Sequence, residues 1–116
     1  MAYVKLHKQK HTAKSEPLIT IGSQGIFYLN SFVMRKHFQN VKFVEFDYDK
    51  ERKQLALQPV ANETEDSFRL NYSSVSKSTG VVAARSIAKE IKIDFTKTKQ
   101  YKAVWNSEKK FLEIKL

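Results

Sequence analysis

The stretches that decide the expected fold are GIFYLNSF at residues 25–32 and GVVAARSI at residues 80–87. At an offset of 55 residues, glycine falls on glycine, serine falls on serine, and most apolar residues fall on apolar residues. A second pair of stretches, DKERKQLAL at 49–57 and NSEKKFLEI at 106–114, matches at an offset of 57. Because internal similarity at a nearly fixed spacing indicates a repeated structural unit, we predict that the chain contains two copies of one unit.

The first copy has the pattern strand, strand, helix, strand, strand. Alternating apolar and polar residues predict the strands, and Asn30 is the expected N-cap of a short helix that runs through Gln39. The polar turn DKER at 49–52 joins the last two strands into a hairpin. The strands of this copy are predicted at residues 18–22, 26–29, 41–48 and 54–58.

The second copy repeats this order after an acidic linker at residues 61–66. Its first two strands are separated by a longer loop, residues 74–80, that is rich in Ser and Thr. We predict strands at 68–73, 81–83, 100–105 and 110–116, with a helix at 84–92. In terms of domains, we expect a flexible basic arm at 1–16 and a single domain at 17–116, made of repeats at 17–60 and 67–116.

The repeated unit resembles the swapped-hairpin family of AbrB-, MazE- and SpoVT-type proteins. The resemblance rests on residues 19–60, while residues 68–116 match more loosely. The matching residues are Ile19-Thr20-Ile21, Gly25-Ile26-Phe27, Arg35, Val44-Glu45-Phe46-Asp47 and Leu55-Ala56-Leu57-Gln58-Pro59.

This resemblance implies a mainly β protein of the α+β class, in which two ββαββ units interleave into a swapped-hairpin or double-psi-like β-barrel with two short helices. Interleaving suits such a unit because one copy alone has open strand edges and too small a core. In the family the barrel is normally a homodimer, and MraZ-like members carry both units in one chain. Both a monomer with pseudo-twofold symmetry and a homodimer are therefore open for this chain.

The resemblance also implies DNA binding through basic side chains around the first turn, the second strand and the helix. The first copy departs from that pattern, because residues 26–30 replace the family's usual basic residue, Gln and Ile-Pro with IFYLN. The second copy offers Lys77 in its loop and Arg85 at the start of its helix. We therefore expect the second copy to carry the main contacts.

The charge of the chain agrees with a polyanionic partner. Lys and Arg number 21 against 12 Asp and Glu, which gives a net charge of +9, and the excess is spread over both halves. Such a balance favours binding to DNA, RNA or an anionic surface. Lysine-rich surfaces also serve solubility and thermal stability, so charge alone leaves the partner open.

The strongest candidate surface lies in the second copy. If residues 84–92 are helical, three basic residues share one face at spacings i, i+4 and i+7, and Lys77 lies among hydroxyls that suit phosphate oxygens. Glu90 interrupts the stripe, so an ordinary solvated helix face is an equal alternative. The candidate residues are Lys77, Arg85, Lys89, Lys92, Lys97 and Lys99.

Two further basic groups are candidates for the same role. Arg35 and Lys36 lie on the first helix, opposite its apolar side, where a solvated face is the alternative. Lys8, Lys10 and Lys14 lie in the N-terminal arm, which is typical both of arms that wrap nucleic acid and of disordered ends.

Aromatic residues recur on the predicted hairpin strands. Their rings could stack on the bases of a single strand, but aromatic residues on alternating strands belong more often to the core. We expect the hairpin aromatics to be core residues, and Tyr28 and Tyr72 to be the exposed exceptions. The hairpin aromatics are Phe43, Phe46, Tyr48, Tyr101, Trp105 and Phe111.

The sequence predicts neither an enzyme nor a cofactor. The chain has no cysteine, and it has no phosphate-binding loop, dinucleotide-binding motif or nucleophile elbow. His7 and His11 have the spacing of a helical metal chelate but no third ligand, so we expect no metal site.

Residues 1–16 lack the apolar segment of a secretory signal, and no apolar run approaches the ~20 residues of a membrane span. We therefore expect a cytoplasmic protein without membrane contact.

Three functional hypotheses follow from the sequence. In the first, the protein is a transcription-regulator-like DNA-binding protein whose basic loop and helix contact the phosphate backbone. In the second, the same barrel is a docking module that recognises an acidic protein. In the third, the protein binds RNA. DNA is favoured over RNA because of the family resemblance.

Overall fold

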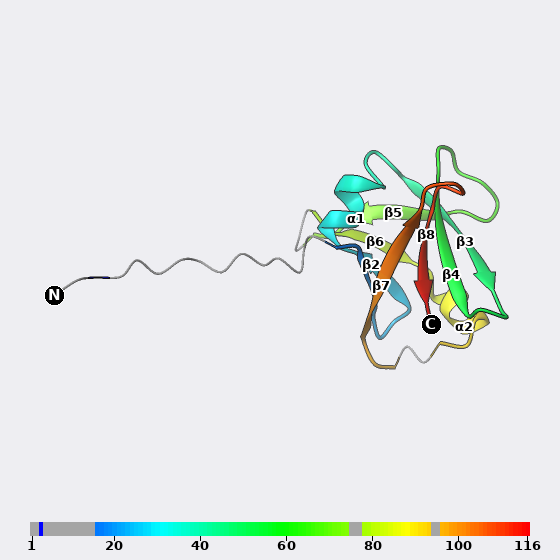
Figure 1. The fold of residues 1–116 in the computed structure, drawn as a ribbon. Coiled ribbons are helices and arrows are strands. Elements are labelled where there is room, and N and C mark those ends of the chain that lie inside the picture. The colour runs from blue at the N-terminus through cyan, green and yellow to red at the C-terminus, as the bar shows by residue number, and fades with distance from the viewer. Residues whose placement is uncertain (1–2, 4–15, 75–77, 94–95) are drawn as a thin grey trace.

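The structure is a computed structural model that describes residue 3 and residues 16–74, 78–93 and 96–116 (Figure 1). Four of the candidate lysines lie outside the described residues, namely Lys8, Lys10, Lys14 and Lys77. The possible metal ligands His7 and His11 lie outside them as well.

The described residues form a closed antiparallel barrel of eight strands with two short helices, α1 and α2. Around the barrel the strands follow the order β1-β2-β6-β5-β3-β4-β8-β7. The prediction of a mainly β barrel is therefore confirmed. The elements are β1 (Leu18–Ile21), β2 (Ile26–Leu29), α1 (Ser31–Lys36), β3 (Phe43–Asp49), β4 (Gln54–Val60), β5 (Phe68–Tyr72), β6 (Gly80–Ala83), α2 (Arg85–Glu90), β7 (Lys99–Asn106) and β8 (Phe111–Lys115).

Strand pairing runs across the two halves of the chain. β1 pairs with β7, with Ile19 opposite Tyr101, and β5 pairs with β3, with Phe68 opposite Val44. β2 also pairs with β6, and β4 with β8. Neither half therefore closes a sheet by itself.

The two long hairpins have turns of the same construction. The Asp49 carboxylate accepts hydrogen bonds from the amides of the residues two and three positions on, at 3.1 Å each. The Asn106 side chain does the same in the second hairpin, also at 3.1 Å each. Each turn ends on a lysine in the left-handed region, Lys53 with φ 54° and Lys110 with φ 56°. These local bonds explain why the polar four-residue stretches were recognisable as turns.

Both helices are shorter than the sequence predicts. Asn30 does cap α1, because its side chain accepts a hydrogen bond from the Val33 amide at 3.1 Å. However, α1 ends at Lys36 and not at Gln39, and α2 covers Arg85–Glu90 and not residues 84–92. Each helix is followed by a turn in which an amide donates a hydrogen bond to the carbonyl five residues earlier. These bonds run from Phe38 to Val33 and from Ile93 to Ala88.

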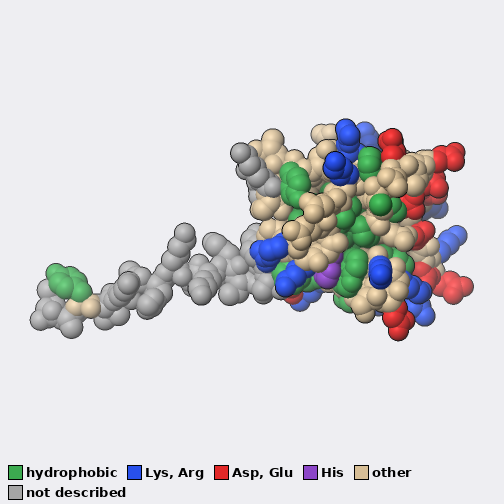
Figure 2. Space-filling view, turned by 90° about the horizontal axis from the view of Figure 1, so that it is seen from above, with side chains coloured by type: hydrophobic (Ala, Val, Ile, Leu, Met, Phe, Trp, Pro, Cys, Tyr) green, Lys and Arg blue, Asp and Glu red, His purple; other side chains and the backbone are tan. Residues whose placement is uncertain are grey.

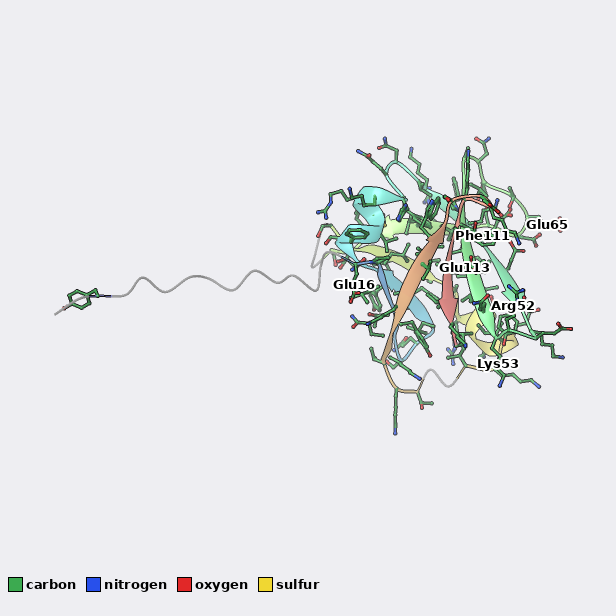
Figure 3. All side chains as sticks on the ribbon, viewed as in Figure 1. Glu16, Arg52, Lys53, Glu65, Phe111 and Glu113 are labelled. Carbon is green, nitrogen blue, oxygen red and sulfur yellow. The ribbon has the colours of Figure 1, made fainter. Side chains whose placement is uncertain are left out.

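The two hairpin turns lie at opposite ends of the barrel, and each lies beside one helix. In Figure 3 the labelled Arg52 and Lys53 of the β3–β4 turn lie at the end that α2 covers. Phe111, which follows the β7–β8 turn, lies toward the other end, where α1 is found. Each helix therefore lies beside the hairpin of the other half of the chain.

The core fills the barrel from both halves of the chain. Alternation along β2 buries Phe27 and Leu29, while Ile26 and Tyr28 are only partly buried. The largest fully buried side chains are Phe27, Phe38, Ile19, Ile21, Leu29, Leu55, Leu57, Leu112, Ile114, Val33, Val44 and Val82.

Candidate nucleic-acid interface

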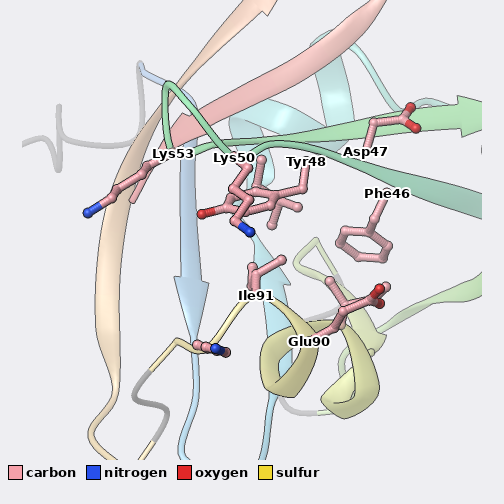
Figure 4. A pocket seen from close by; sticks show the side chains of 10 residues that line it. Phe46, Asp47, Tyr48, Lys50, Lys53, Glu90 and Ile91 are labelled. Carbon is pink, nitrogen blue, oxygen red and sulfur yellow. The ribbon is translucent and has the colours of Figure 1, made fainter.

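Two neighbouring clefts lie beside the β3–β4 hairpin, the first between the hairpin and α2 and the second between the hairpin, the residues that follow α2 and β7. The first has a volume of about 630 Å³ and the second about 570 Å³. Four residues line both clefts: Tyr48, Lys53, Ile91 and Lys92. Figure 4 shows the first cleft, with the Tyr48 ring under the hairpin and Ile91 pointing toward it from the end of α2.

The second cleft, which we call the lysine–tyrosine cleft, is strongly basic. Among the described residues that line it are four lysines and no Asp or Glu. An anion entering this cleft would therefore meet a convergent positive charge. The full lining is Tyr48, Lys53, Ile91, Lys92, Ile93, Lys97, Lys99, Tyr101 and Leu116.

Three separate elements position these lysines. Lys53 closes the β3–β4 turn, and Lys92 follows α2 in the left-handed region with φ 59°. Lys97 precedes β7, and Lys99 begins it, where it pairs with Ile21 of β1. All four lysines are exposed, so their ammonium groups are hydrated and available to a charged partner.

The two tyrosines of the cleft differ in their surroundings. Tyr101 packs against the core, and burial raises the pKa of its hydroxyl. The Lys99 ammonium lies over the Tyr101 ring, 5.3 Å from its centroid. Tyr48 is 37% exposed. Tyr48 is therefore the more accessible aromatic surface in the cleft.

Lys50 adds a further positive charge to the first cleft. Its side chain extends from the β3–β4 turn alongside the Tyr48 ring (Figure 4). The acids of that cleft are Asp47 and Glu90, and in Figure 4 the Asp47 carboxylate points away from the Tyr48 ring.

A third cleft, of about 420 Å³, has the opposite charge. It shares Phe46, Asp47, Ile87 and Glu90 with the first cleft. The charged side chains among its described lining residues are all acidic: Glu45, Asp47, Glu65, Asp66 and Glu90. In the view from above, Asp and Glu side chains gather along one edge of the molecule (Figure 2). The third cleft and the lysine–tyrosine cleft therefore differ in the sign of their charge.

Three of the candidate basic residues come together in the lysine–tyrosine cleft, namely Lys92, Lys97 and Lys99. Arg85 and Lys89 are exposed on α2, and they line neither the first cleft nor the lysine–tyrosine cleft. The predicted stripe of three residues on one helix is wrong for Lys92, because α2 ends at Glu90 and Lys92 stands in the turn that follows.

Arg35 and Lys36 lie elsewhere. Both are exposed on the last turn of α1, which is found near the other end of the barrel (Figure 1). The structure therefore does not bring them together with Lys92, Lys97 and Lys99.

Sequence reasoning missed Lys50, Lys53 and Tyr48. The sequence predicts Lys50 only as a residue of the 49–52 turn, assigns no role to Lys53, and predicts Tyr48 in the core. Of the six hairpin aromatics only Tyr48 is exposed; the other five are half-buried, and Phe46, Tyr101 and Trp105 pack against the core. Tyr72 is exposed as predicted, whereas Tyr28 is half-buried. The alternation of residues predicts which face of β3 each side chain takes. It does not predict that α2, from the other half of the chain, lies beside Tyr48 and leaves it exposed.

At the opposite end of the barrel, the corresponding space is filled by aromatic rings. The imidazole of His37 stacks on the indole of Trp105 with centroids 4.4 Å apart and planes 7° apart. Phe38 meets the same indole edge-on at 6.4 Å. Burial lowers the pKa of His37, and the charge of Lys36 lowers it further.

Within the described ranges, no cluster of three or more His, Cys, Asp or Glu side chains could hold a metal ion. Nor does any described helix have the length and apolarity needed to span a membrane. Comparison of the chain with protein-family models, curated proteins and solved structures found no match.

Proposed function

We propose that this protein binds nucleic acid, with DNA as the favoured target, and that the lysine–tyrosine cleft contacts the phosphate backbone. The observation that carries the proposal is the convergence of Lys53, Lys92, Lys97 and Lys99 on one cleft that has no acidic side chain among its described lining residues. Lysines placed in this way neutralise phosphates and release counterions, which is the main source of affinity for a charged strand.

The separation of charge supports the same proposal. The acidic cleft lies beyond Glu90, so a bound strand is repelled on that side and directed toward the lysines. A transcription-regulator-like role agrees with this surface and with the resemblance to the swapped-hairpin family.

The test is a salt titration of binding to a fluorescein-labelled DNA, followed by fluorescence anisotropy. The double variant Lys97→Gln/Lys99→Gln removes two charges from the cleft, and we expect it to reduce the slope of log K against log salt by about 1.5. The matched control is Lys42→Gln/Lys109→Gln, which removes the same charge from exposed residues that line neither the first cleft nor the lysine–tyrosine cleft. Absence of binding at low salt, or an equal effect of both variants, would contradict the proposal.

We also propose that the barrel consists of two copies of one ββαββ unit. Its support lies in matching local details at the two offsets seen in the sequence. Asp49 and Asn106, 57 residues apart, accept the same two hydrogen bonds in their turns. The amides of Phe38 and Ile93, 55 residues apart, each donate to the carbonyl five residues earlier. The pairings β1–β7 and β5–β3 are counterparts under the same correspondence.

A further inference from the structure

Tyr48 and Trp105 occupy the same place in their hairpins. Tyr48 directly precedes Asp49, and Trp105 directly precedes Asn106. The side chains of Asp49 and Asn106 accept the amide hydrogen bonds of their turns. Each also lies beside the helix of the other half: Tyr48 lines a cleft with Ile91 and Lys92, and Trp105 contacts His37 and Phe38.

The residues that face these two rings also correspond. His37 precedes Phe38, whose amide donates to Val33, and Lys92 precedes Ile93, whose amide donates to Ala88 in the same five-residue pattern. At the α1 end a flat imidazole therefore covers the indole of Trp105. At the α2 end a lysine takes the place of that imidazole, and an open cleft lies beside Tyr48.

The His37–Trp105 stack thus indicates what the open place beside Tyr48 can hold. It is a planar aromatic ring lying flat on an aromatic side chain, with centroids 4.4 Å apart. A nucleobase has the same flat aromatic surface, and base stacking on tyrosine is tolerant of sequence because every base has such a surface. The surrounding lysines would then contact the phosphates on either side of the stacked base.

Tyr48 is better suited to this role than Tyr101. The ring of Tyr101 packs against the hydrophobic core, whereas Tyr48 is not among the residues that pack there. Tyr48 keeps 37% of its surface accessible. A base inside a duplex is stacked on its neighbours and cannot enter a cleft, whereas an unpaired base can.

We infer that the cleft binds single-stranded nucleic acid in preference to duplex, with one unpaired base stacked on Tyr48. This inference rests on the proposed function and specifies its target. Stacking would add affinity that duplex binding lacks, so the preference resides in Tyr48 while the lysines serve both kinds of strand.

Anisotropy with a labelled 12-mer of dT, a 12-mer of U and a 12-base-pair duplex tests the inference. We expect both single strands to bind at least about tenfold more tightly than the duplex at the same salt concentration. Tyr48→Leu should weaken single-strand binding by about 5- to 100-fold and leave duplex binding unchanged, while Tyr48→Phe, which keeps the ring, should retain it. Tyr72→Leu is the matched control, because Tyr72 is 56% exposed but lies on β5 outside the cleft.

The outcomes separate the two proposals. Duplex binding as tight as single-strand binding, or a Tyr48→Leu effect shared by both, overturns the base-stacking inference and leaves the proposed function in place. A lack of binding to all three probes overturns both. Far-ultraviolet circular dichroism of each variant verifies that the barrel is intact, and Tyr48→Phe supplies the stacking test if Tyr48→Leu does not fold.

Discussion

The imidazole of His37 lies flat on the indole of Trp105, with ring planes only 7° apart, and so joins the end of α1 to β7 of the other half of the chain. Phe38 supports the indole from the side, edge-on. The contact closes one end of the barrel by aromatic packing. The other end, where Tyr48 and Lys92 face each other across a cleft, is left open, and this asymmetry distinguishes the two halves.

The stack itself is expected to contribute measurably to stability. In a double-mutant cycle of His37→Ala and Trp105→Ala, we expect a coupling free energy of about 0.5–1.5 kcal/mol, the value typical of aromatic pairs. Urea unfolding of the four proteins measures it. A cycle of Tyr72→Ala with Trp105→Ala is the control, and a His37–Trp105 coupling no larger than that of the control pair contradicts the prediction.

Stability should fall on mild acidification because of His37. Its pKa in the folded protein is lowered from 6.5 by burial and by Lys36, so the unfolded chain takes up the proton first as the pH falls. The free energy of unfolding should therefore decrease as the pH falls below 6.5, because this contribution is fully present above the unfolded pKa and is lost as the pH falls through the lowered pKa of the folded protein. Parallel urea titrations of the wild type and His37→Gln isolate it from the other groups. A difference between the two proteins that does not change with pH would refute this prediction.

Much of the barrel was predictable because its signals are local. The apolar alternation of residues 26–29 specifies β2, and the polar stretches at 49–52 and 106–109 form side-chain bonds within their own turns. Asn30 caps α1 through a bond that spans only three residues. Interactions of this kind are encoded in a few neighbouring residues and need no knowledge of the rest of the chain.

The helix ends and the cleft were not predictable in the same way. A left-handed residue after a helix is usually glycine, and here Lys92 takes that conformation, so no glycine marks the end of α2 at Glu90. The cleft depends on pairing between distant strands, such as Leu18 with Lys102. Strand alternation specifies which face a side chain takes but not which distant element covers that face.

Gly25 should be far less tolerant of substitution than Gly22. Its φ of +73° is left-handed, and an added Cβ would lie 2.6 Å from the Cα of Arg85 at the start of α2. Gly22→Ala would meet only the end of the Tyr28 ring, at 3.0 Å, which can shift. We expect Gly25→Ala to cost about 2–4 kcal/mol and Gly22→Ala less than about 1 kcal/mol in thermal or urea unfolding. Similar losses for the two variants would show that the turn can move away from α2.

Asn30 should stabilise the protein through both the oxygen and the nitrogen of its side-chain amide. Its oxygen caps α1, and its nitrogen donates to the Glu16 carbonyl at 2.8 Å, which fixes the chain just before β1. Asn30→Ala loses both bonds and should cost about 1–2 kcal/mol. Asn30→Asp keeps the cap and loses only the donor, so it should fall between the wild type and Asn30→Ala in urea unfolding. Equal stability of the two variants would mean that the cap contributes nothing.

The β3–β4 turn should tolerate asparagine at position 49, because the β7–β8 turn has Asn106 at the equivalent position. The Asp49 oxygen accepts from the Glu51 and Arg52 amides just as the Asn106 oxygen accepts from two amides of its own turn, so Asp49→Asn should preserve both bonds. Its ion pair with Arg52 is 3.8 Å long and solvent-exposed, and such pairs contribute little. In urea unfolding we therefore expect Asp49→Asn and Arg52→Ala each to change stability by less than about 0.5 kcal/mol, whereas Asp49→Ala should cost about 1 kcal/mol. A loss for Asp49→Asn as large as that for Asp49→Ala would mean that the charge of Asp49, and not its hydrogen bonds, holds the turn, and that the two turns are not interchangeable.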